Sequence, residues 1–282
     1  MILIADAGST KIEWALLDDN GTQLIRTKTR GHNAAISHPE ALAKSLREEA
    51  PALYSEAQRV DEIFYYGAGC AGERRAVMAD TLAGIFNSEC CHAESDMLGA
   101  ARALCGHDEG IACILGTGSN SCHYDGVKIT ANVSPLGFIL GDEGSGAVLG
   151  RRLIGMVLKG GFSKEIAERF KWRFPEATVQ EIVTRVYRSD RPNSYLASFV
   201  PFLSENINEK EVEEFVTDEF KRFFRFNVQN YDDSTALPIN FTGSVAYHFT
   251  PQLRKAAESC GYRIGKIEKA PMESLIAFHG GK

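Results

Sequence analysis

The chain has 282 residues, a formal net charge of −6 and ordinary hydrophobic and charged fractions, so it is long enough for two domains that each bury a core. The acidic balance argues against a general nucleic-acid binder, because phosphate binding needs clustered Lys and Arg. No segment approaches the ~18 consecutive apolar residues of a membrane span, and the opening Met-Ile-Leu-Ile-Ala-Asp is typical of a first strand and not of an export signal. We therefore expect a cytoplasmic protein without nucleic-acid or membrane partners.

Seven cysteines, an odd number, occur without a Cys-x-x-Cys pair. Their spacing predicts neither a disulfide framework nor a zinc finger. Mostly apolar neighbours favour buried, reduced thiols. A cluster shared between two subunits stays open, because ligands donated by two chains need no motif within one chain.

The first elements predict an antiparallel meander that continues as alternating strands and helices. Strands are expected at residues 2–5 and 12–17, followed by an Asp-Asn-Gly turn and a third strand. Ser37-His38-Pro39-Glu40 combines a capping box with Pro in the first turn, which predicts the start of a helix. A strand at 63–66, a helix at 73–86 and a strand at 90–93 follow. This order indicates an α/β domain.

The same pattern restarts near residue 111. A strand at 111–115, a Gly/Ser/Thr loop at 116–120, a second strand to Tyr124 and an Asp-Gly turn repeat the opening of the chain. Such a repeat predicts two related domains that face each other across a cleft. The remaining expected elements are helices at 151–158, 164–174, 179–187 and 210–228, a strand at 239–242 and a final helix from Pro271.

Three turns have the composition of anion or nucleotide sites. In the hairpins Asp6 to Lys11 and Gly116 to Asn120, small residues let backbone N–H groups converge on phosphate. Thr242-Gly243-Ser244 follows a strand and precedes a helical pattern, so it could border a nucleobase or ribose. Each turn taken alone is weak evidence, because an ordinary strand connection also needs Gly for its geometry, and the repetition of the hairpin strengthens the phosphate interpretation.

These motifs, together with Gly141-Asp142-Glu143-Gly144-Ser145-Gly146, resemble the N-acetylglucosamine kinase and BadF/BadG/BcrA/BcrD ATPase family over nearly the whole chain. That family belongs to the superfamily of acetate and sugar kinases, Hsp70 and actin. The resemblance implies two actin-like (ribonuclease H-like) domains, at residues 1–105 and 106–282, with the last helix packing back on the first domain. It also implies ATP and Mg²⁺ as cofactors, a small sugar as substrate and a homodimer.

The resemblance implies roles for individual positions. Asp6 matches the position near magnesium. The positions that match nucleotide contacts are Gly8, Ser9, Thr10, Lys11, Gly116, Thr117, Gly118, Gly243 and Ser244. The positions that match sugar contacts are Asn33, Ser119, Asn120, Gly137 and Asp142.

Asp96 matches the carboxylate that accepts the proton of the attacking sugar hydroxyl. From the sequence alone it is a candidate helix N-cap, because a helical pattern follows it. A place at a helix start predicts a lowered pKa, which would keep the carboxylate ionised.

The function implied is ATP-dependent phosphorylation of an amino sugar, such as N-acetylglucosamine. An ATPase coupled to electron transfer through an iron–sulfur cluster is an alternative within the family, and a sugar sensor without catalysis is another. Gly67 to Gly72 also fits a dinucleotide fingerprint, with Glu89 as the ribose-binding acid. This NAD hypothesis is weakened by the meander that precedes the motif, because the fingerprint normally follows the first strand of its domain.

Overall fold

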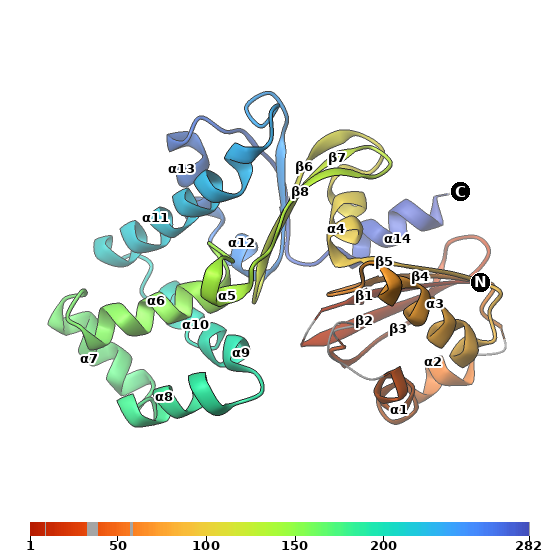
Figure 1. Cartoon of the computed structure of the whole chain (residues 1–282), viewed down its shortest axis with the longest axis horizontal. Helices are drawn as coiled ribbons and strands as arrows, with labels where there is room; N and C mark the ends of the chain where they lie inside the picture. Colours follow the sequence, from red (N-terminus) through yellow and green to blue (C-terminus); the bar gives the residue numbers. More distant parts are fainter. Residues whose placement is uncertain (9, 33–38, 57–58, 282) are drawn as a thin grey trace. The chain divides into compact units, whose positions relative to one another are not determined.

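The computed structural model describes residues 1–8, 10–32, 39–56 and 59–281. The chain forms two compact units (Figure 1). The first contains Met1–Asp108, Asp125–Ile129 and Ala270–Lys282, and the second contains Glu109–Tyr124 and Thr130–Lys269. No helix among the described residues combines the length and the apolar character needed to cross a membrane.

The first unit is built on a mixed five-stranded sheet with the order β3-β2-β1-β4-β5. The strands are β1 (Ile2–Ala7), β2 (Lys11–Leu17), β3 (Gln23–Arg30), β4 (Glu62–Gly67) and β5 (Cys90–Ser95). β1, β2 and β3 form the antiparallel meander, whereas β1, β4 and β5 run parallel. The carboxyl ends of these three parallel strands therefore lie along one edge of the sheet.

Helices cover both faces of this sheet (Figure 1). The helices are α1 (Pro39–Glu49), α2 (Pro51–Ser55), α3 (Glu73–Phe86), α4 (Asp96–Cys105) and α14 (Met272–Gly280). One core joins Trp14 of β2 to Leu46 of α1 and Leu82 of α3. A second core joins Phe64 of β4 to Met272 of α14. The last helix thus packs within the first unit, where it contacts α4.

The second unit repeats the strand order of the first. Its strands are β6 (Glu109–Leu115), β7 (Ser119–Asp125), β8 (Ile129–Val133), β9 (Ile239–Thr242) and β10 (Ile264–Glu268). The sheet order β8-β7-β6-β9-β10 corresponds strand for strand to β3-β2-β1-β4-β5. β6, β9 and β10 are parallel, and the short β6–β7 and β7–β8 connections require antiparallel pairs. The internal repeat predicted from the sequence is confirmed.

The helices of the second unit pack around a core rich in phenylalanine, including Phe170, Phe202, Phe223 and Phe241. They are α5 (Gly137–Leu140), α6 (Gly146–Leu158), α7 (Lys164–Arg173), α8 (Val179–Arg188), α9 (Pro192–Ala197), α10 (Val200–Glu205), α11 (Lys210–Phe226), α12 (Ser244–His248) and α13 (Thr250–Ser259), with a 3₁₀ turn at Val228–Asn230. The helices α5, α9, α10 and α13 and the strand β10 were not predicted.

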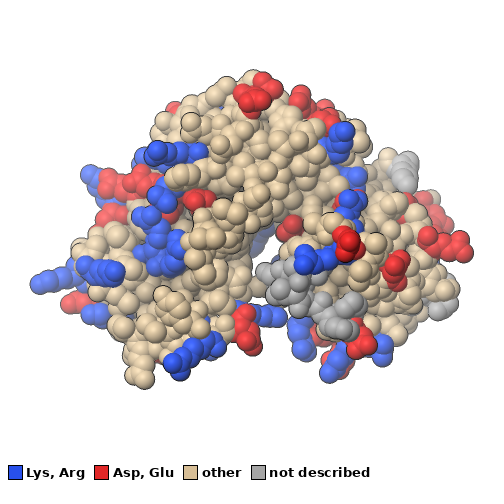
Figure 2. Space-filling model, viewed as in Figure 1, with Lys and Arg blue, Asp and Glu red and all other residues tan. Residues whose placement is uncertain are grey.

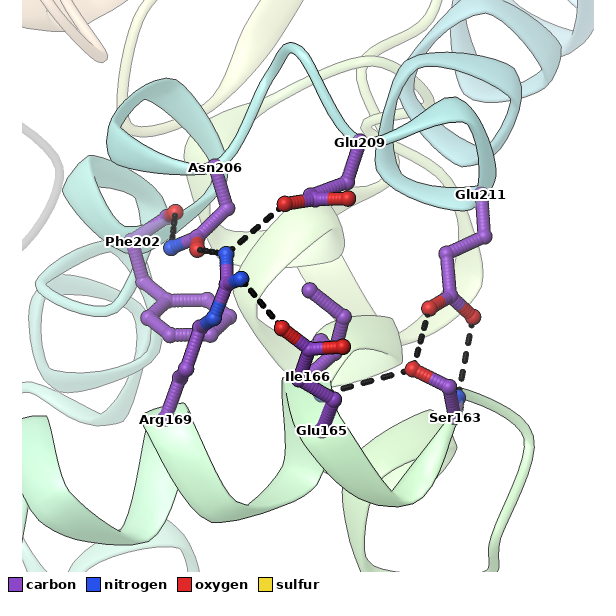
Figure 3. Close-up of polar contacts among 8 residues, drawn as sticks. All are labelled: Ser163, Glu165, Ile166, Arg169, Phe202, Asn206, Glu209 and Glu211. Carbon is purple, nitrogen blue, oxygen red and sulfur yellow. Dashed lines mark hydrogen bonds and ion pairs between the residues drawn. The ribbon is translucent and has the colours of Figure 1, made fainter.

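Polar contacts at the start of α7 hold this helix against α11 and the segment before it (Figure 3). The Ser163 hydroxyl caps α7 by accepting from the Ile166 N–H and donates to the carboxylate of Glu211. Further along α7, Arg169 donates to Glu165, one turn before it, and to Asn206 and Glu209. In Figure 2 basic and acidic side chains are similarly interspersed over the visible face of each unit. Such exposed ion pairs fix the placement of helices more than they add stability.

Candidate active site

Two carboxylates gather where the parallel strands of the first sheet end. Asp6 is the penultimate residue of β1, and Asp96 follows β5 directly as the first residue of α4. In the register Asp6 lies beside Tyr66 of β4, and Tyr66 lies beside Glu94 of β5. The two carboxylates repel each other strongly enough that Asp96 contributes to the raised pKa of Asp6. The structure therefore brings the predicted metal position and the predicted base into one cluster.

Asp96 occupies the first turn of α4, but it does not cap the helix. The N-cap is Ser95, whose hydroxyl accepts from the Leu98 N–H at 3.3 Å. Asp96 Oδ1 accepts from the N–H of Met97 at 2.9 Å. Burial nevertheless raises the pKa of Asp96 above its usual value, and the backbone hydrogen bonds oppose this only in part. The prediction of a lowered pKa was wrong, because loss of hydration outweighs the helix terminus here.

Asp6 has a pKa raised to about 7, first by burial and then by repulsion from Asp96 and Glu13, which Lys11 opposes. Glu13 is itself buried on β2 and is paired with Arg26, with Arg26 Nη2 2.7 Å from Glu13 Oε1. A half-buried group of carboxylates that repel one another is a suitable oxygen donor set for Mg²⁺. The residues present at this edge thus fit the predicted ion, and the role of Asp6 as its ligand stays a prediction.

The β1–β2 hairpin is closed by its own backbone. The Gly8 N–H donates to the Lys11 carbonyl at 2.9 Å, and the Thr10 carbonyl accepts from the Gly31 N–H at 3.1 Å. Ala7 keeps a negative φ within β1, so its methyl group causes no backbone strain there. Ser9 and the predicted sugar contact Asn33 lie outside the described residues.

The second hairpin is held by the first turn of α6. The Gly146 N–H donates to the Gly116 carbonyl at 2.8 Å, and the Ala147 N–H donates to the Thr117 carbonyl at 3.0 Å. In a trans peptide the C=O and the next N–H point in opposite directions. The N–H groups of Thr117 and Gly118 are therefore turned away from α6. Two adjacent donors with the same orientation form a suitable cradle for a phosphate oxygen.

Asp142 lies against this hairpin. Its Oδ2 would be 3.1 Å from a Cβ atom at Gly118, so a side chain there would displace the carboxylate by a few tenths of an ångström. The Gly137 N–H donates to its carboxyl group, yet burial and the neighbouring Glu143 raise the pKa of Asp142 to about 6. The helix cap is Ser145, which accepts from the Val148 N–H at 3.2 Å. Ser145, and not Asp142, therefore caps α6.

Asn120 and Ser119 continue the same hairpin on β7. The side-chain oxygen of Asn120 accepts from the Ser121 N–H and from Asn132 Nδ2, both at 2.9 Å. These contacts fix the amide plane and leave the Asn120 amide nitrogen as a donor. Ser119 is buried, which makes it a support for the hairpin more than an exposed contact.

Gly243 completes the cluster in the second unit. It has φ 116° and ψ 155°, a conformation restricted to glycine, and a Cβ here would be 2.3 Å from the Leu115 carbonyl. Its N–H donates to Glu268 at 3.0 Å, and Ser244 starts α12. The predicted adenosine turn therefore lies directly beside the predicted phosphate hairpin.

Two buried hydroxyl groups near these clusters were missed. Tyr65 Oη and Thr242 Oγ1 are fully enclosed and have no hydrogen-bond partner among the described residues. The pKa of Tyr65 is raised by burial and by nearby Cys70, Asp96 and Asp6. Both residues belong to apolar strand patterns, so the sequence predicts their burial but not where the hydroxyl group points.

The alternative sites are less well formed. Gly67 to Gly72 follows β4, which lies between β1 and β5, and not the first strand of its unit. A side chain at Gly67 would collide with the ring of Tyr65, which explains this glycine without a dinucleotide. None of the seven cysteines, all of which lie in the described ranges, forms a disulfide; Cys70, Cys113 and Cys122 are buried and the other four are half-buried.

Comparison with known proteins decides the family. The sequence profile of the BadF/BadG/BcrA/BcrD ATPase family matches residues 5–215. The chain belongs to this family. A search of curated protein sequences gives no match to this BadF-family protein.

Solved structures agree with this assignment. A candidate N-acetylglucosamine kinase from Porphyromonas gingivalis is 42% identical to the BadF-family chain, with TM-score 0.95, over 100% of this chain and 99% of that one. A candidate N-acetylglucosamine kinase from Chromobacterium violaceum is 17% identical, with TM-score 0.76 over 98% of both chains. A ROK-family glucokinase from Streptomyces griseus, in complex with glucose and AMPPNP, is 17% identical, with TM-score 0.56 over 98% and 97%. The fold is that of the sugar kinases and actin-like ATPases.

Gly243→Ala tests the packing of the second cluster. We expect it to lower the free energy of unfolding by more than ~3 kcal/mol, because a strained backbone and a collision with Leu115 add together. Gly261→Ala is the matched control, since Gly261 has φ +78° but open space around it, and its expected loss is ~1–2 kcal/mol. Thermal unfolding of both variants measures the difference. Equal losses would show that close approach at Gly243 is unimportant.

Proposed function

We propose that this protein transfers the γ-phosphoryl group of ATP to a hydroxyl group of an amino sugar of the N-acetylglucosamine class. Full-length similarity to a candidate N-acetylglucosamine kinase at 42% identity supports the substrate class. The observation that carries the proposal is the pairing of Asp6 and Asp96 at one edge of the first sheet. We further propose that the chain divides into domains 1–105 and 106–282, with the last helix packed on the first domain, and that the enzyme is a cytoplasmic homodimer.

Asp96 would accept the proton of the attacking hydroxyl. A carboxylate with a raised pKa is a stronger base than an exposed one, and it is still ionised once the pH exceeds that pKa. The Met97 N–H holds one of its oxygens, which orients the other for the substrate. Because phosphoryl transfer depends mainly on alignment and charge stabilisation, this fixed orientation matters more than basicity.

Asp6 would hold Mg²⁺. When bound, the ion neutralises the charge of the phosphate oxygens. Lys11, which already interacts with Asp6, together with Gly8 and Thr10 in the same hairpin, would contact phosphate. Ser9 is proposed as a further contact.

The second unit would bind the rest of both substrates. The outward N–H groups of Thr117 and Gly118 would receive phosphate, and Gly243 with Ser244 would border the adenosine. Asp142 would accept hydrogen bonds from sugar hydroxyl groups, with Gly137 orienting its carboxylate. Asn120 would donate to the sugar, and Ser119 and Asn33 are proposed as further sugar contacts.

Asp96→Asn tests the proton acceptor. We expect turnover to fall by about 10²–10⁴-fold, because the amide keeps the shape of the side chain but cannot take a proton. ATP affinity should remain nearly unchanged, since other residues hold the nucleotide. Asp80→Asn, at an exposed position of α3, is the control and should retain full turnover. Near-normal turnover of Asp96→Asn in an ADP-release assay would rule out the proposed base.

The raised pKa of Asp142 predicts a pH-dependent sugar affinity. Below about pH 6 the carboxyl group is protonated and accepts fewer hydrogen bonds, so KM for the sugar should rise as the pH falls through that value. Glu143→Gln should move this rise to lower pH, because the Glu143 charge helps to raise the Asp142 pKa. Steady-state kinetics between pH 5 and 8 would measure both. A sugar KM that is independent of pH across this range would contradict the role of Asp142.

A further inference from the structure

Three side chains with metal-binding atoms meet at the opposite end of the first sheet from Asp6 and Asp96. They are Glu62, the first residue of β4, and Cys90 and His92 of β5. Each offers one ligand atom, and these atoms all lie within 4.8 Å of one another. From Cys90 to Ser95 the strand spans ~17 Å at ~3.3 Å per residue. The group is therefore separate from the candidate active site.

The backbone register creates this group. Residues two apart on a strand point to the same face, so Cys90 and His92 share a face of β5. Glu62 is the register partner of Cys90 on the neighbouring parallel strand, and Phe64 is the partner of His92. The Phe64 and His92 rings stack with centroids 5.0 Å apart and an interplanar angle of 15°. This stacking fixes the orientation of the imidazole before any ligand binds.

The distances match the edges of a tetrahedral site. Cys90 Sγ is 3.3 Å from His92 Nε2 and 3.9 Å from Glu62 Oε1, and Nε2 is 3.3 Å from Oε1. With ordinary zinc–ligand bond lengths, a tetrahedral ion requires about 3.6, 3.6 and 3.4 Å for these three separations. Each observed distance is thus within about 0.3 Å of the requirement, and only a small adjustment is needed.

The same geometry argues against a nucleophilic triad. In a triad the histidine contacts the nucleophile with one ring nitrogen and the carboxylate with the other. Here both the thiol and the carboxylate lie at 3.3 Å from the same nitrogen, Nε2 of His92. Three donor atoms that converge on one point fit a shared cation and not a proton relay.

We propose that Glu62, Cys90 and His92 bind a divalent transition-metal ion of the zinc class. A thiolate and a carboxylate supply two negative charges and the imidazole is neutral, so the ion is balanced in charge. Sulfur and nitrogen ligands favour Zn²⁺ or Co²⁺ over Mg²⁺. Three protein ligands leave one coordination position for water. The His92 side chain is 49% exposed, so an ion can reach the group from solvent.

The test is a Co²⁺ titration of the full-length protein, prepared metal-free with a chelator under anaerobic conditions. We expect one equivalent of Co²⁺ to produce a thiolate-to-cobalt absorption band that Zn²⁺ displaces. Cys90→Ser should abolish the band, and His92→Gln should weaken Co²⁺ binding at least about tenfold. Cys91→Ser is the matched control, because Cys91 points to the opposite face and packs against the other core.

Absence of a band with the unaltered protein, or a band that persists in Cys90→Ser, would overturn the proposal. If Cys90→Ser does not fold, Glu62→Gln decides, and unchanged Co²⁺ affinity in that variant would equally overturn it. ADP release by the folded variants is measured in parallel. It is expected to stay unchanged, because the site lies at the other end of the sheet from Asp96.

Discussion

Parallel pairing of the inner strands is the constraint on which the sites of this protein depend. In the first sheet β1, β4 and β5 end at the same edge, which places Asp6 and Asp96 in one interacting cluster. In the second, β6 and β9 are parallel neighbours, which places Gly243 against Leu115 and the hairpin that follows it. Ligand sites in α/β sheets lie outside the carboxyl ends of their strands. The repeated fold therefore places two related candidate sites by one rule, and the opposite end of the first sheet holds the Glu62–Cys90–His92 group.

Burial sets the electrostatics of these sites. Asp6, Asp96 and Asp142 all have raised pKa values, and loss of hydration is the largest cause for each. Carboxylates held in this way gain from a cation or from sugar hydroxyl groups that replace the missing water. Glycines at 118 and 243 have the complementary role, because a side chain would displace the Asp142 carboxylate at Gly118 and would collide with the Leu115 backbone at Gly243. We infer that packing preorganises the candidate sites, and that the substrates would supply the charge and hydrogen bonds that compensate for the lost hydration.

Much of the fold could be predicted, since turn residues and apolar periods are local signals. The helix at 73–86 and the strand at 239–242 have the predicted bounds, and the repeated meander indicated the duplicated sheets. Short elements such as α9 and α10 were missed because six residues show no clear period. The direction of the Asp96 pKa shift was wrong because burial depends on distant parts of the chain. Register between strands is equally non-local, so nothing in the sequence showed that Glu62 lies beside Cys90, 28 positions later. The assignment of individual site residues remains a prediction.

The most direct test of the central claim is an ADP-release assay with magnesium ATP and a panel of hexoses, hexosamines, N-acetylhexosamines and muramic-acid derivatives. If the protein is an amino-sugar kinase, at least one N-acetylated amino sugar will raise ADP release well above the rate without sugar. One phosphorylated sugar will form for each ADP released. If no sugar increased ADP release, amino-sugar phosphorylation would be contradicted. Sugar-independent hydrolysis would then favour an ATPase coupled to electron transfer, whereas hexosamine binding without turnover would favour a sensor.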